Sequence, residues 1–84
     1  MLSPVMSLAQ LPHAFRAVVE SVDWTRLAAP EAKRLRELGL DEGVSVEMVH
    51  RATIGGGPLA CRIGRMTVAL RRHVAQAIHV VPAG

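Results

Sequence analysis

The spacing of apolar residues changes abruptly at Gly43. From Val44 to Met48, apolar residues alternate with Ser45 and Glu47. Such an every-second-residue pattern is typical of a strand with one buried face and one face in water. The alternation returns in two later segments, and a last short apolar run ends at a proline. We therefore predict strands over residues 44–48, 59–63, 66–71 and 78–81.

Before that point the apolar spacing is helical. Ala32, Leu35 and Leu38 recur at three-residue steps and form one apolar stripe. Pro30 suits the first helical position, where its missing N–H removes no hydrogen bond. Gly39 can adopt the left-handed conformation that ends many helices. The sequence therefore predicts one short helix that begins at the proline and ends before the glycine.

These elements predict a mainly β domain, namely a small closed barrel of five short strands with one short α-helix between the first and second strands. The first strand is Phe15–Val22, where valines are interleaved with polar residues. Single turns are predicted at Leu8–Leu11 and His73–Ala77. Closure is expected because it leaves no exposed sheet edge. Residues 1–6 are predicted to be a flexible leader and residues 7–84 a single domain.

Composition excludes several classes of protein. The 84 residues carry a net charge of +3 that is spread along the chain, and Phe15 and Trp24 are the only aromatic residues. Neither a basic stripe nor a stacking platform for nucleic acid is therefore present, and we predict no nucleic-acid binding. Cys61 is the only cysteine, which excludes a disulfide within the chain. No apolar stretch approaches the roughly 20 residues that span a bilayer, and no export signal is recognisable, so we predict a cytoplasmic protein.

An ordered series of short motifs resembles one family. Arg34–Gly43 is similar to a helix that ends in Leu-Gly, with a second glycine opening the next strand, in the bacterial ferrous iron transport protein A (FeoA) family. Leu8–Pro12 resembles the opening of that family, and Gly57-Pro58 and Gly64 resemble two of its turns. Val68–Val80 resembles its closing segment. The similarity covers nearly the whole chain after residue 6.

The chain departs from the family pattern at two positions. His13-Ala14 stands where the family often has a glycine after its opening proline. Val74 stands where an acidic residue often precedes the alanine that Ala75 matches. These differences concern the shapes of local loops.

The resemblance implies an SH3-like barrel and a cytosolic accessory role in ferrous iron uptake. The implied partner is the ferrous iron permease FeoB, through its cytosolic GTP-binding domain or its membrane domain, which would place the protein peripherally at the inner membrane. The alternative is the metal-sensing SH3-like domain of an iron-dependent repressor of the diphtheria-toxin-repressor type. Such repressors also need a helix-turn-helix domain, and the sequence shows none.

No catalytic residues are predicted. The sequence has no evident set of nucleophile, base and orienting group. Gly55–Gly57 are followed by proline and a strand, and not by the Lys-Ser/Thr and helix of a phosphate-binding loop. The chain is therefore not expected to be an enzyme, and no cofactor is required.

One pair of residues is a candidate metal site. If the hairpin turn centres between Gly55 and Gly56, then His50 falls opposite Cys61 on the same face of the sheet. Directly opposed Cβ atoms lie about 5 Å apart. A thiolate and an imidazole at that spacing suit weakly bound Fe²⁺ or Zn²⁺, completed by solvent or by a second copy in a metal-bridged homodimer. The competing interpretation is that Cys61 is a small core residue, aligned with its apolar neighbours along the strand.

Two features are candidates for partner contact. The first is the glycine-rich hairpin tip, because loop tips often carry binding residues. The second is a set of arginines at outward or turn positions, which suits an acidic partner surface or the cytoplasmic leaflet. An ordinary solvated face is the competing interpretation. The candidate partner-binding residues are Gly55, Gly56, Gly57, Arg62, Arg65, Arg71 and Arg72.

Overall fold

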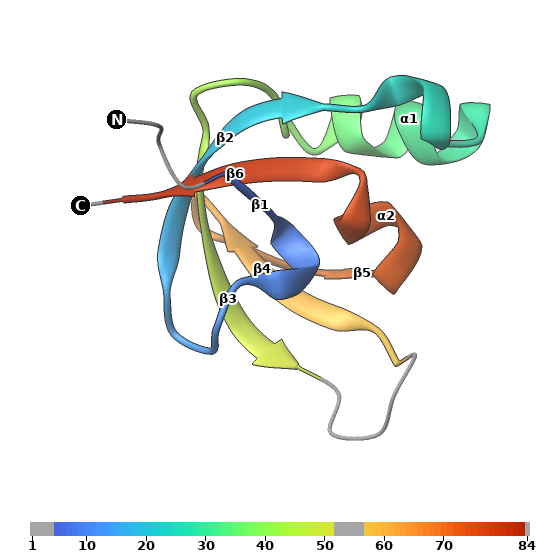
Figure 1. Cartoon of the computed structure of the whole chain (residues 1–84). Helices are drawn as coiled ribbons and strands as arrows, with labels where there is room; N and C mark the ends of the chain where they lie inside the picture. The colour runs from blue at the N-terminus through green and yellow to red at the C-terminus, as the bar shows by residue number, and fades with distance from the viewer. Residues whose placement is uncertain (1–4, 52–56, 84) are drawn as a thin grey trace.

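The computed structural model describes residues 5–51 and 57–83, which form an antiparallel sheet of six strands with two α-helices (Figure 1). The strands follow the order β1-β6-β2-β3-β4-β5 across the sheet. Their bounds are β1 Met6–Ser7, β2 Arg16–Val22, β3 Ser45–Arg51, β4 Leu59–Ile63, β5 Met66–Leu70 and β6 Ile78–Pro82. The helices are α1 Ala29–Glu37 and α2 Arg72–Gln76, with short 3₁₀ turns η1 Leu8–Gln10 and η2 Trp24–Arg26.

The five predicted strands and the predicted helix are all present, but the sheet has a sixth strand. The additional strand, β1, is formed by Met6 and Ser7, which pair with Val80 and His79 of β6. Met6 therefore belongs to the sheet and not to a leader. Two residues are too few for any alternating pattern to identify a strand, so β1 could not be predicted from periodicity.

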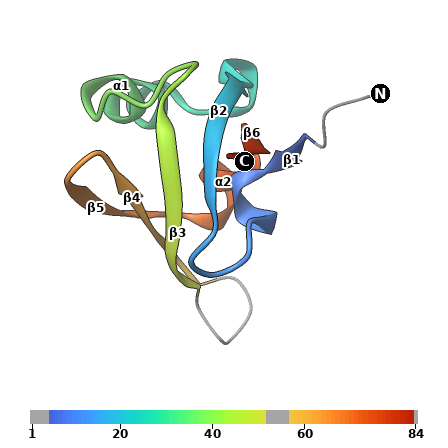
Figure 2. The ribbon, with the colours of Figure 1, turned by 90° about the vertical axis from the view of Figure 1, so that its left-hand side faces the viewer.

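The prediction of a closed barrel is wrong. Within the described residues, β1 and β5 are the two edges of the sheet and do not pair with each other. The sheet is nevertheless strongly curved, as the second view shows (Figure 2). The reason it stays open is that β5 runs directly into α2, and α2 packs against η1 across the opening. A helix and a 3₁₀ turn thus stand where a hydrogen-bonded pair of strands would close a barrel.

The concave side of the curved sheet holds the core. Side chains that alternate along the strands point inward, and they pack with residues from η1, α1 and α2. No charged or polar side chain is buried among the described residues. The largest fully buried side chains are Leu8, Leu11, Val19, Leu35, Leu40, Met48, Leu59, Cys61, Ile78 and Val80.

The end of α1 is fixed by a Schellman motif. The N–H of Gly39 donates to the carbonyl of Arg36, and the N–H of Leu40 donates to the carbonyl of Leu35, both at 3.0 Å. Gly39 adopts a φ of +77°, which an L side chain rarely does. Leu35 and Leu40 are both fully buried, which supplies the apolar contact that usually accompanies this motif. The predicted stop at Gly39 is therefore correct, and it also directs the chain back into the core.

Candidate functional site

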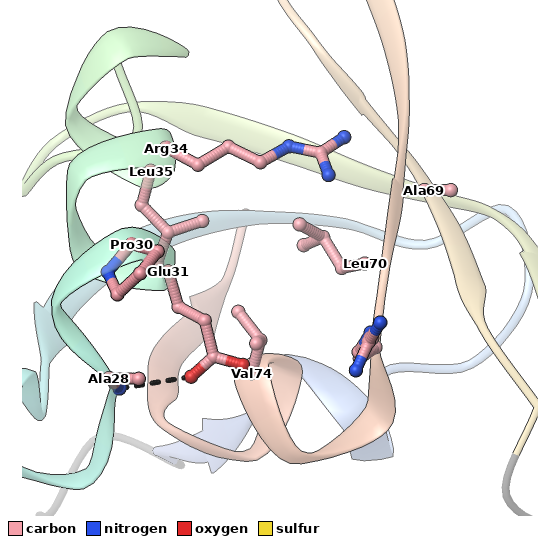
Figure 3. A pocket seen from close by; sticks show the side chains of 9 residues that line it. Ala28, Pro30, Glu31, Arg34, Leu35, Ala69, Leu70 and Val74 are labelled. Carbon is pink, nitrogen blue, oxygen red and sulfur yellow. Dashed lines mark hydrogen bonds between the residues drawn. The ribbon is translucent and has the colours of Figure 1, made fainter.

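A groove of about 440 Å³ lies between α1 and the end of β5 (Figure 3). Its base is apolar, because the buried side chains of Leu35 and Leu70 point into the space between the two elements, beside Val74 of α2. Charged groups stand at its rim. The residues that line it are Ala28, Pro30, Glu31, Arg34, Leu35, Ala69, Leu70, Arg71 and Val74.

Glu31 holds one side of the groove in place. Its Oε1 accepts a hydrogen bond from the backbone N–H of Ala28 at 3.0 Å, and its Oε2 accepts one from Nε2 of His73 at 2.5 Å. The Ala28 N–H, followed by His73, lowers the pKa of the Glu31 carboxyl below its ordinary value, so the side chain is anionic at neutral pH. Both carboxylate oxygens are thus used within the protein. Glu31 therefore links α1 to α2, and its carboxylate is not free to bind a ligand.

Two guanidinium groups are available at the same rim. Arg34 and Arg71 are both exposed, and neither forms an ion pair or a side-chain hydrogen bond within the described parts of the chain. Arg34 extends from α1 toward β5 across the groove (Figure 3). A guanidinium presents several donors in a plane that matches a carboxylate. The groove can therefore bind an anionic group that is joined to apolar side chains.

The predicted pairing of His50 with Cys61 is wrong. Cys61 lies opposite Met48, and His50 lies opposite Ala60. The His50–Ala60 pair is already displaced by one residue from the predicted register, and a β-bulge at Val49 displaces the pairs beyond it, including Met48–Cys61, by one more. A shift of one residue moves a side chain to the other face of the sheet. His50 is accordingly exposed, whereas Cys61 is fully buried in the core.

Burial also makes Cys61 a poor metal ligand. Loss of solvent raises the pKa of its thiol to about 11, and the ligating form of cysteine is the thiolate. Within residues 5–51 and 57–83, no three His, Cys, Asp or Glu side chains are grouped closely enough to hold a metal ion. The alternative interpretation of Cys61 as a small core residue is the one that the structure supports.

The candidate arginines form two pairs rather than one patch. Arg62 and Arg65 lie at the turn end of the β4–β5 hairpin, and Arg71 and Arg72 follow the other end of β5. At about 3.3 Å per residue, the strand separates Arg65 from Arg71 by roughly 20 Å. Arg71 contributes to the groove, whereas Arg72 is half-buried.

The remaining partner-binding candidates are three glycines of the hairpin tip. Gly57 is half-buried just before β4. Gly55 and Gly56 lie outside the described residues, so partner contact at this tip stays a prediction.

Sequence reasoning missed two residues that line the groove, Glu31 and Arg34, and the partner of Glu31, His73. Glu31 and Arg34 looked like ordinary first-turn and solvent-facing residues of a helix, and His73 like a surface residue. The position of Glu31, three residues after Ala28, is a local capping signal that pointed to its bond with the Ala28 N–H. No local signal brings Glu31 to His73, because these residues are 42 positions apart.

None of the described helices is long and apolar enough to cross a membrane.

A family model and two solved structures point to the same family. The model of the FeoA domain family matches residues 6–82. The crystal structure of Stenotrophomonas maltophilia FeoA, complexed with zinc, is 43% identical, covers 89% of this chain and 88% of its own, and superposes with a TM-score of 0.75. That protein is described as a procaryotic SH3 domain protein and a candidate ferrous iron transport activating factor. Chlorobium tepidum FeoA is 29% identical over 94% of this chain and 71% of its own, with a TM-score of 0.81.

The similarity to one further solved structure concerns the fold alone. A manganese-dependent transcriptional repressor is 19% identical and has a TM-score of 0.83 over 99% of this chain but only 44% of its own. No curated protein matches the sequence.

Proposed function

This chain belongs to the FeoA family, and on that premise we propose that it is a cytosolic accessory protein of bacterial ferrous iron uptake that binds and regulates the permease FeoB. The family match over residues 6–82 is the observation that carries the proposal. The 43% identical relative, described as a candidate iron transport activating factor, supports the same role. The proposed activity is protein binding, not catalysis.

The surface of the domain supports a binding role. The groove between α1 and β5 combines an apolar base with two guanidinium groups that form no ion pair or side-chain hydrogen bond within the described residues. Contacts of this kind give both apolar burial and charge steering toward an acidic partner. Charge steering weakens with salt, because mobile ions screen exposed charges over about 10 Å at 0.1 M.

A pull-down tests the proposal. The tagged protein should retain both detergent-solubilised full-length permease and, if the contact is cytosolic, the isolated GTP-binding domain. Retention should fall as salt rises. Absence of retention of either form, at low and at moderate salt, would contradict the proposed function.

A metal is not required for this function, although weak capture of Zn²⁺ or Fe²⁺ remains a prediction. The zinc in the related structure is a reason to test it. His50 is exposed and Cys61 is not, so any capture would use surface histidines shared with solvent or with a second copy. In calorimetry with either ion, Cys61→Ser should bind like the wild type. A loss of binding in Cys61→Ser would revive the thiol as a ligand.

The repressor alternative receives less support. The likeness to the manganese-dependent repressor lies below the identity at which function can be transferred, and this chain spans less than half of that protein. Binding of operator DNA at physiological salt would restore the alternative.

A further inference from the structure

We propose that the open edge of β5, together with the groove beside α1, binds an extended acidic segment of a partner protein as an added strand. The proposal rests on the proposed function for the identity of the partner, and it names the surface and the kind of segment involved. It can fail while that function stands.

The backbone of β5 has one unpaired side. Gly64, with a φ of +61°, begins a two-residue hairpin turn, and Ile63 lies opposite Met66 across it. The residues that flank such a turn exchange hydrogen bonds, and the backbone groups then alternate in direction along the strand. Thr67 and Ala69 therefore direct their N–H and C=O groups away from β4. Within the described residues no other strand pairs with them.

Of the two edges of the sheet, β5 offers the longer backbone for pairing with an added strand. β5 has five residues, whereas β1 at the opposite edge has only two. An edge of unpaired N–H and C=O groups is a template for another strand, and several peptide-recognition domains use it in this way. A segment that pairs with Thr67 and Ala69 would run beside β5 into the groove.

The groove suits the side chains of an added strand. Successive side chains of a strand point to opposite faces, so every second residue of the segment would point toward the apolar base formed by Leu35 and Leu70. The intervening residues would point to the opposite, solvent-exposed face of the sheet, where Arg71 follows the exposed Thr67 and Ala69 at every second position. Arg34 lies on the groove side, where it extends from α1 toward β5 beside the apolar base (Figure 3). The expected segment therefore alternates apolar and acidic residues.

Charge decides which partner the edge accepts. Arg65 precedes β5, and Arg71 and Arg72 follow it, with no acidic residue between them in the sequence. Glu31, on the facing helix, is the acidic side chain that lines the groove; both of its carboxylate oxygens are in internal hydrogen bonds, and the guanidinium groups of Arg34 and Arg71 outnumber its single charge. Two copies joined edge to edge through β5 would bring these arginines together, and like charges on opposed strands are destabilising. An acidic segment meets attraction at both ends of the strand instead.

Amide chemical-shift mapping with model peptides tests the chemistry directly. The probe is a short acetylated and amidated peptide in which valine and glutamate alternate. It should shift the amides of Thr67, Ala69, Leu70 and the first turns of α1. Two matched controls, a valine–lysine peptide and a valine–glutamate peptide with N-methyl groups on one edge, should bind at least about tenfold more weakly. Equal binding by the three peptides, or shifts centred on another face, would overturn the proposal.

Variants of the protein separate the contribution of backbone pairing at the edge of β5 from the contribution of the arginine charges to peptide binding. Ala69→Pro removes an outward N–H, and proline is tolerated on edge strands where that N–H faces solvent. Arg34→Glu with Arg71→Glu reverses the rim charge. Both should weaken binding of the valine–glutamate peptide at least about tenfold, whereas Arg16→Glu, at an exposed position of β2 and three strands away from β5, should not. A heteronuclear spectrum of each variant establishes that it is folded.

The same variants, used with the permease, keep the two hypotheses apart. If the double arginine variant and Arg16→Glu retain the permease equally well, then the edge is not the docking surface, although the proposed function stands. If the wild type binds the acidic peptide at β5 but retains no form of the permease, then the proposed function fails. The binding site at the edge of β5 would then remain, with a different protein as its partner. Formation of a dimer that Ala69→Pro abolishes would identify a second copy as the occupant and overturn the acidic segment.

Discussion

Glu31 and His73 form a hydrogen bond of 2.5 Å that joins α1 to α2. The two side chains are 42 residues apart in sequence, and both are partly exposed, at 25% and 52% respectively. The second oxygen of Glu31 accepts from the N–H of Ala28 at the start of α1. One carboxylate therefore fixes both the beginning of α1 and its distance from α2.

This bond should make stability depend on pH in the acid range. The Glu31 pKa in the folded state lies below the ordinary value of 4.5. Its contribution is therefore complete above about pH 4.5 and is lost as the pH falls through the folded pKa. Urea unfolding of wild type and Glu31→Gln should show a stability difference at neutral pH that shrinks in acid. Glu37→Gln, at the end of the same helix, is the control. A difference that stays constant across the acid range would contradict the assignment.

Ala14→Gly should stabilise the protein. Ala14 has a φ of +67°, the only positive value among the described residues other than glycine. The left-handed conformation costs an L residue roughly 1–2 kcal/mol, which glycine avoids. Part of this gain is offset by the greater entropy of glycine in the unfolded chain, so we expect a net gain of about 1 kcal/mol. Chemical denaturation measures it.

The reciprocal change supplies the control for that prediction. Gly39 has a similar φ of +77°, and a Cβ built there would meet nothing within 4 Å. Gly39→Ala should therefore lose about 1 kcal/mol through the backbone alone. If both substitutions change stability in the same direction, then backbone conformation is not the cause.

Cys61 should not react with thiol reagents while the protein is folded. Its thiol is buried and its pKa is raised to about 11, so the reactive thiolate is scarce at neutral pH. A chromogenic thiol reagent should react at the rate at which the protein opens, and promptly in denaturant. Rapid labelling of the native protein would show that the thiol is accessible.

Ala28→Ser should strengthen the start of α1. Ala28 occupies the N-cap position with an extended backbone, but it has no side-chain acceptor for the N–H of Glu31. Serine would complete a capping box with the existing bond from Glu31, a gain of about 1 kcal/mol. Thermal unfolding measures the gain, and Ala29→Ser, one residue into the helix, should not reproduce it.

Patterns confined to a few neighbouring residues predicted the local elements well. The alternation over residues 59–63 coincides with β4, and the signals at Pro30 and Gly39 bracket α1 within one or two residues. These signals act through a residue's own backbone and its nearest neighbours, so they can be recognised in a single sequence. The resemblance to the FeoA family was confirmed for the same reason, because its motifs are turns and helix ends.

Features that depend on distant parts of the chain could not be predicted in this way. One extra residue at Val49 changed which side chain of β3 lies opposite Cys61, and the alternating pattern gives no warning of such a bulge. The open sheet depends on how α2 meets η1. At the candidate site, Arg71 was among the predicted partner-binding residues. Arg34 and Glu31 were not, because only the folded chain brings α1 beside β5.

The interior position of β6 in the sheet constrains how the molecule can be made in the cell. This strand lies between β1 and β2, yet it is the last of the six to be synthesised. Until β6 has left the ribosome, β1 and β2 lack the strand that lies between them. The nascent chain therefore cannot fold stepwise from its N-terminal end. We expect the domain to fold in a single late event, and chains interrupted before Ile78 to be targets for chaperones and proteases.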